Sequence, residues 1–408
     1  MPRLEYGPAA AYSDASPWSL RETPMPLNRR QFLVTSAAAL ASATTLALPA
    51  LADTDNPKPS PTGDPLAGLT VINALGGIGD PNFPDARPWT LTPRMLADAR
   101  ASGVTAVNCT LGYVAGPQDP FQKSVADIGR YDVMIRQHPG DLIKVLSVAD
   151  IRRAQAERRI GLIYGFQNAA QMGDDASRVD IFANLGVRVI QLTYNVRNQL
   201  GDGSIVPEGR GLTPFGHEVV ERLNTNRIMV DLSHSGRQIC LDAARASTRP
   251  ISINHTGCRA LVDLPRNKTD EELRLVADKG GFIGIYFMPF LSPSGHATAA
   301  DVVAHIEHAL KVCGEDHVGI GTDGSITPID DLQAYGAALA REHADRVAKG
   351  IAAPGERADT HPFVDDLRGP DQFRKLYRLL AARGHQPARI EKILGGNFVR
   401  YASDVWGA

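Results

Sequence analysis

The sequence predicts an α/β fold, a (β/α)8 barrel of the TIM type, on three observations. Short apolar runs alternate with helix-like, capped segments eight times between Leu69 and Asp323, which is typical of parallel strands joined by helical crossovers. Two of these runs close on a histidine, His234 and His255, as barrel strands do when they aim side chains into one mouth. No glycine-rich dinucleotide fingerprint follows the first strand, which disfavours an open doubly wound sheet.

The first 52 residues are interpreted as a leader, with Met25 as an alternative start. Arg29-Arg30 precede an uncharged run, rich in alanine, leucine and threonine, that reaches Ala50-Leu51-Ala52. That small-x-small ending indicates cleavage by signal peptidase, and the paired arginines predict export to the periplasm by the twin-arginine route. The alternative interpretation is that this run is not cleaved and remains as a membrane anchor. No second apolar span of about twenty residues follows, so we expect no membrane anchor in the mature chain.

Residues 53–64, rich in proline, aspartate and threonine, are expected to be a linker, and residues 65–408 to form a single barrel domain. The expected strands are 69–75, 104–110, 160–166, 187–194, 228–234, 250–255, 282–287 and 317–323. Expected helices begin at Thr92-Pro93, at the capping box of Thr269 with Glu272 and at the cap Thr298, and others span 148–159, 177–185, 371–383 and 387–394. The polar excursion 112–141 is expected to lie over the barrel mouth.

The composition excludes some classes of partner. The 43 Lys and Arg residues balance 45 Asp and Glu residues, which argues against nucleic acid or an anionic membrane surface as a partner and favours a small or neutral one. The 4 cysteines are scattered without CxxC spacing. This pattern predicts buried thiols rather than a disulfide framework or a structural zinc site.

Five side chains that follow strands are expected to converge at the mouth: Gln167, Tyr194, His234, His255 and Asp323. Two neutral imidazoles and a carboxylate could hold a zinc ion with an open position for water, whose pKa the metal would lower toward neutrality. Asp323 could instead act as a general base that takes the proton from the water and passes it to a leaving amine.

Several longer runs of the sequence are similar to runs of a known protein family. They occur in the same order as in that family and cover nearly the whole chain that follows the leader. They are Asn184-Leu185-Gly186-Val187-Arg188, Leu192-Thr193-Tyr194-Asn195, Gly211-Leu212-Thr213-Pro214-Phe215-Gly216, Asp231-Leu232-Ser233-His234, Arg266-Asn267, Gly280-Gly281, Gly319-Ile320-Gly321-Thr322-Asp323 and Gly395-Gly396-Asn397. With these runs the sequence resembles the membrane dipeptidase family, peptidase family M19.

The resemblance implies a metal-dependent barrel of the amidohydrolase kind that cleaves dipeptides with two zinc ions bridged by a glutamate. By position, His234 and His255 match the histidines of the second zinc site, and Asp323 matches the acid/base aspartate. Arg266 matches the arginine that holds the substrate carboxylate, a task that suits a planar guanidinium because it can grip a carboxylate with two hydrogen bonds.

The sequence also departs from the family pattern at three places. The His-x-Asp pair of the first zinc site aligns with Leu75-Gly76-Gly77, the bridging glutamate with Gln167, and a substrate-facing histidine with Tyr194. Losing the ligand pair and the bridging charge together is electrostatically consistent, since a carboxylate left without its cation would be costly. We therefore expect one zinc ion at most, with Gln167 and Tyr194 as substrate-binding residues beside Arg266.

The function predicted from the sequence is that of an exported metallohydrolase acting on a dipeptide or a related amide. One alternative is a periplasmic tailoring enzyme for a peptide natural product such as a siderophore precursor, and another is a catalytically silent barrel that binds peptides. A homodimer is a further possibility that the sequence leaves undecided. His305 and His308, despite metal-like spacing, are expected on a solvated helix face, and Cys258 is expected to be a buried thiol rather than a ligand.

Overall fold

The structure, a computed structural model, describes residues 63–82, 91–207, 209–348, 350, 352 and 354–407. The predicted leader and all but the last two residues of the predicted linker lie outside them. The strands are β1 Ile72–Gly76, β2 Ala106–Thr110, β3 Leu142–Lys144, β4 Ile160–Phe166, β5 Val187–Gln191, β6 Met229–Asp231, β7 Ser252–Thr256, β8 Phe282–Ile285 and β9 Val318–Ile320.

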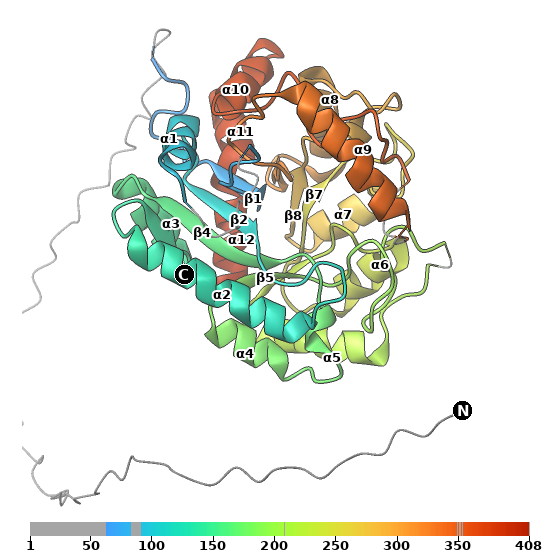
Figure 1. Ribbon diagram of the computed structural model, residues 1–408. Helices are drawn as coiled ribbons and strands as arrows, with labels where there is room; N and C mark the ends of the chain where they lie inside the picture. Colours follow the sequence, from blue (N-terminus) through green and yellow to red (C-terminus); the bar gives the residue numbers. More distant parts are fainter. Residues whose placement is uncertain are drawn as a thin grey trace, which may run out of the picture. The chain divides into compact units, whose positions relative to one another are not determined.

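Eight of the strands form a parallel barrel in the order β1-β2-β4-β5-β6-β7-β8-β9. Hydrogen bonds just beyond the strand ends join its first and last strands: the Asp323 amide donates to Leu75 O at 2.9 Å and the Gly77 amide to Gly324 O at 3.0 Å. Below them, Asn73 Nδ2 donates to Thr322 Oγ1 at 2.8 Å. The helices surround the strands (Figure 1), which confirms the predicted (β/α)8 fold.

The α-helices are α1 Pro93–Ser102, α2 Pro120–Gln137, α3 Val148–Ala156, α4 Arg178–Asn184, α5 Pro214–Thr225, α6 Arg237–Ala246, α7 Asp270–Asp278, α8 Ala299–Cys313, α9 Leu332–Ala348, α10 Gln372–Ala382, α11 Pro387–Glu391 and α12 Asn397–Trp406. The start signals read from the sequence are present. Thr92 caps α1 with Pro93 next to it, and Thr269 and Glu272 form the capping box of α7.

Helix α12 packs at the end of the barrel opposite the mouth. Its buried residues Phe398 and Tyr401 share an apolar cluster with Ile72, Val189 and Met229. Ile72 and Met229 are the first residues of β1 and β6. Burial of two aromatic side chains contributes several kcal/mol of stabilisation at about 25 cal/mol per Å². This packing fixes one end of the strands and leaves the other end for the site.

Three details differ from the sequence prediction. The strand β3 was missed, because a three-residue strand gives almost no periodic signal; it pairs only with β4, outside the barrel order. The excursion 112–141 was assigned wrongly as a cover of the mouth, since most of it is α2, which buries Ile128 and Met134 in the core. Helices α5, α9 and α12 were not predicted.

Within the described part of the chain, no helix is both long and apolar enough to cross a membrane. All four cysteines are free and buried, which confirms the prediction of buried thiols. His305 is buried, accepts from the Cys258 amide at 2.8 Å and bonds Leu291 O at 3.1 Å. The expectation of a solvated face was therefore wrong for His305, which joins α8 to the loop after β7.

Candidate active site

A buried carboxylate orders the two segments that carry the histidines. Asp231, at the end of β6, accepts hydrogen bonds from the amides of Ser233 and Asn254, each at 3.0 Å. Ser233 Oγ donates to the same carboxylate and accepts from the His255 amide at 3.0 Å. Burial raises the pKa of Asp231 although these hydrogen bonds oppose the shift. Asp231 thereby links the ends of β6 and β7 and sets His234 beside His255.

The His234 ring is fixed at both nitrogens. Nδ1 lies 2.7 Å from Asn195 Oδ1, an acceptor, so Nδ1 carries the proton and Nε2 has the lone pair. Arg266 donates to Nε2 at 3.1 Å, and the Tyr194 ring stacks on the imidazole at 4.2 Å between centroids. Burial and the nearby Arg266 charge lower the pKa of His234 well below its usual value. The ring is therefore neutral, in the tautomer that presents Nε2.

His255 lacks hydrogen-bond partners among the described residues. Both of its ring nitrogens are buried and unpaired, and its side chain is 0% exposed. Nε2 lies 4.0 Å from Asp323 Oδ2, too far for a hydrogen bond. Burial lowers the pKa of His255 well below its usual value, so the ring is neutral. A buried polar group without a partner is costly, typically by about 1–3 kcal/mol, and such a group indicates a missing ligand.

Asp323 follows β9 in a left-handed backbone conformation, with φ of 56°, which is uncommon for a residue with a side chain and clusters at functional sites. Its side chain is 21% exposed at the mouth. Burial raises the pKa of Asp323 to about 6, and the charges of Arg266 and Arg346 oppose the shift. A carboxyl group with that pKa suits general acid–base work near neutral pH.

Three side chains of the site are placed where they could hold a metal ion. Ligand atoms of His234, His255 and Asp323 all lie within 4.8 Å of one another, and the unpaired His255 imidazole calls for a partner. The His234 lone pair can accept from only one group, so a cation there would replace the Arg266 hydrogen bond. On the other side of the mouth, Leu75 and Gly77 offer no ligand atom, and a Cβ at Gly76 would lie 2.2 Å from Asn73 Nδ2. The side chains at these positions cannot supply the ligands that the family pattern places at its first zinc site.

The structure gathers two of the three predicted substrate-binding residues. Arg266 and Tyr194 line the pocket above the triad. Arg266 is 2% exposed, donates to Ser233 O and lies 5.9 Å from the Tyr286 ring centroid. Gln167 instead donates to Thr110 Oγ1 at 2.7 Å and is not among the pocket's lining residues.

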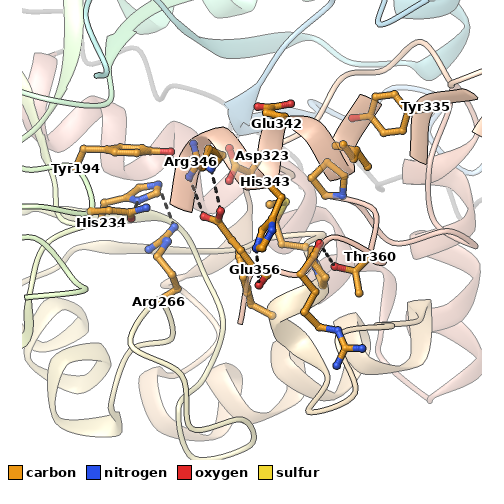
Figure 2. A pocket seen from close by; sticks show the side chains of 17 residues that line it. Tyr194, His234, Arg266, Asp323, Tyr335, Glu342, His343, Arg346, Glu356 and Thr360 are labelled. Atoms are coloured by element: carbon orange, nitrogen blue, oxygen red, sulfur yellow. Dashed lines mark hydrogen bonds and ion pairs between the residues drawn. The ribbon is translucent and has the colours of Figure 1, made fainter. Parts of the chain in front are cut away.

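The pocket over the triad has a volume of about 310 Å³ and is roofed by residues that the sequence reasoning missed (Figure 2). Helix α9 contributes Tyr335, Leu339, Glu342, His343 and Arg346, and the segment after it contributes Glu356 and Thr360. Arg346 binds Glu356 through two hydrogen bonds of 2.8 Å and also bonds the Tyr194 hydroxyl. Their signal in the sequence was a helix-length run, rich in alanine and charged residues, that begins at Leu332, after the last strand.

A parallel barrel with imidazoles and a carboxylate converging at the carboxyl ends of its strands defines the class of protein: a hydrolase barrel built to hold a metal. Residues 92–338, more than half of the chain, match the sequence profile of the membrane dipeptidase family (peptidase family M19). The chain belongs to this family, which confirms the resemblance read from the sequence. It is thereby a dipeptidase-like metallohydrolase.

Individual relatives agree with this assignment. The structure of an amidohydrolase from Pseudomonas aeruginosa is 33% identical with a TM-score of 0.71, and the match covers 84% of this chain and 98% of that one. An uncharacterized protein in the pqqA 5′ region of Klebsiella pneumoniae is 26% identical over 301 residues, 71% of this chain and 98% of its own. Dipeptidase tcpJ of Claviceps purpurea (strain 20.1) is 27% identical over 260 residues, 63% of this chain and 53% of the dipeptidase.

Proposed function

We propose that the protein is an exported hydrolase that cleaves a dipeptide or a related amide and holds at most one zinc ion, on His234 and His255, with Asp323 as the acid–base group. The main support for the proposal is the unpaired imidazole of His255, which lies close to the Asp323 carboxylate. Asp323 and Arg266 both line the pocket above it. A silent binding barrel would have no need to keep a buried, unpartnered imidazole, because leaving it so costs stability.

In the proposed hydrolysis, each residue of the site has a separate role. Zinc, when bound, supplies Lewis-acid polarisation of a carbonyl and makes water more acidic. Asp323 takes a proton from the attacking water on its carboxylate and passes it to the nitrogen of the leaving amine. Arg266 holds the substrate's free carboxylate, and the Tyr194 ring, stacked on His234, forms the adjoining wall.

The pocket size supports a small substrate. A volume of about 310 Å³ lies at the lower end of the range for ligand sites, about 300–1,000 Å³, and suits a ligand of dipeptide size. This volume favours a small substrate over a large one. A tailoring enzyme for a peptide natural product would use the same groups, but its larger substrate would require the α9 roof to move.

Simple dipeptides are expected to be poor substrates. Without ligands at Leu75 and Gly77, the site lacks one source of electrostatic stabilisation, and a single such interaction is typically worth about 3–4 kcal/mol, roughly 100- to 1,000-fold in rate. The measurement is kcat/KM on a panel of L,L- and L,D-dipeptides with and without added zinc, with expected values well below the usual range of about 10⁴–10⁸ M⁻¹s⁻¹. Ordinary rates on these substrates would contradict the account.

Replacing Arg266 should remove the preference for a free carboxylate. Charge-assisted hydrogen bonds contribute about 1.5–3 kcal/mol each, so Arg266→Ala is expected to raise KM for a carboxylate-bearing substrate by about 10- to 100-fold. KM for the C-terminal amide of the same substrate should change little. Arg266→Lys, which keeps the charge but not the planar fork, should lie in between. An equal loss on acid and amide would show that Arg266 only supports His234.

Export by the twin-arginine route is part of the proposal, supported by Arg29-Arg30 and by the alanine-rich run that ends at Ala52. Replacing both arginines with lysine should leave the precursor in the cytoplasm, while the wild-type protein reaches the periplasm and is cleaved after Ala52. Cell fractionation with N-terminal sequencing of the mature chain measures both events. Unchanged export of the double lysine variant would refute the assigned route.

A further inference from the structure

Helix α9 is a roof over the pocket rather than a part of the packed core. None of its residues with described side chains is buried, although it spans 17 positions. Its pocket-lining residues fall at intervals of four, three, one and three positions, which places them on one helix face: Tyr335, Leu339, Glu342, His343 and Arg346. A helix normally buries such a face against other side chains, and this one presents it to the reaction site.

Arg346 is the member of this face that is held most firmly. Its Nε and Nη2 donate to the two carboxylate oxygens of Glu356, each at 2.8 Å, and the pair is largely covered, with side chains 24% and 17% exposed. His343 bonds the backbone oxygen of Glu356 at 3.2 Å. A guanidinium fixed by a bidentate ion pair keeps its direction, which is the property that a preorganised donor needs.

The guanidinium groups of Arg346 and Arg266 both line the pocket over the triad. Arg346 bonds the Tyr194 hydroxyl and lines the same pocket as Asp323 and His234. Figure 2 shows Arg346 with Tyr194 on one side and Asp323 on the other. Arg266, by contrast, donates hydrogen bonds from two of its nitrogens to Ser233 O and to His234 Nε2. The two arginines are therefore held by different partners, Arg346 by Glu356 in the roof and Arg266 by Ser233 below it.

We propose that Arg346 is a further catalytic residue, which donates a hydrogen bond to the carbonyl oxygen of the scissile amide as negative charge develops on it. The proposal rests on the function proposed above. When the water oxygen bonds to the carbonyl carbon, Asp323 takes one proton and the carbonyl oxygen becomes negative. When the C–N bond breaks, that oxygen returns to a carbonyl and the nitrogen receives the proton. Arg346 keeps its protons throughout, and Glu356 acts as its positioning residue.

The first test is a binding measurement that does not depend on turnover. A phosphinate analogue of a dipeptide carries a tetrahedral, negatively charged group where the dipeptide has a planar amide. Arg346→Ala should weaken phosphinate binding by about 100-fold or more, while binding of the planar dipeptide changes by less than about threefold. Arg341→Ala is the matched control, because Arg341 lies exposed on the same helix outside the pocket lining, and it should leave both affinities unchanged. Equal weakening of both ligands, or none, would overturn the proposal.

The second test separates this role from a structural one. Arg346→Ala should lower kcat with little change in KM, and added guanidinium ion should restore part of kcat, while the thermal unfolding midpoint stays close to that of Arg341→Ala. A loss of kcat without rescue, with a lowered midpoint, would mean that Arg346 only holds the roof in place. If the wild-type protein hydrolyses an amide and Arg346→Ala hydrolyses it with the same kcat, the catalytic role of Arg346 is refuted and the proposed function stands. If wild-type protein neither binds the phosphinate nor hydrolyses any amide, the proposed function fails as well.

Discussion

Asp323→Asn is expected to lower kcat by about 100- to 10,000-fold, the usual contribution of a general acid–base group. An amide of the same shape fills the same space but cannot take a proton from water. The left-handed backbone at this position, with φ of 56°, is well tolerated by asparagine. The variant should therefore fold and keep its affinity for substrate.

The check on this prediction combines single-turnover kinetics with thermal unfolding of both proteins. Asp323→Asn should unfold at nearly the wild-type temperature and show an unchanged KM on the best substrate of the panel. If kcat survives the substitution, Asp323 is not the acid–base group. If the unfolding midpoint falls sharply, the loss of activity has a structural cause.

Replacing His255 is the second change with a large expected effect. His255→Ala should abolish metal binding and remove nearly all activity, because His234 would be left as the one imidazole of the site, too few protein ligands for the usual catalytic zinc site. A ligand that binds the folded chain alone stabilises it, so added zinc should raise the unfolding midpoint of the wild-type protein and not that of His255→Ala.

His308→Ala provides the matched control for this substitution. His308 lies on α8 and is paired with Asp270 at 2.7 Å, outside the lining of the pocket. The control should respond to zinc as the wild-type protein does. A midpoint that rises with zinc in His255→Ala as much as in the control would place the metal elsewhere.

The sequence was sufficient for most of the fold because barrel strands are buried on both faces and therefore appear as uninterrupted apolar runs. The eight runs of the barrel were found with boundaries shifted by a few residues, and β4 matched at both ends. Helix α9 left no comparable signal. Its inner face lines a wet pocket, so that face carries Glu342, His343 and Arg346 instead of an apolar stripe.

The site was predictable to the extent that position along the chain determines position in space. Residues after parallel strands meet at one end of a barrel, and the structure does bring His234, His255 and Asp323 together. The direction of each side chain was not predictable, because it depends on neighbours that are distant in sequence. Gln167 shows this: it follows β4 as expected, yet it binds Thr110 rather than the pocket.

The measurement that tests the account most directly is the metal content of the purified mature protein, by elemental analysis, after dialysis against buffered zinc. The account predicts no more than one zinc ion per chain in the wild-type protein and none in His234→Ala or His255→Ala. Two tightly bound ions per chain would contradict it, since residues other than Leu75 and Gly77 would then have to supply a complete first site.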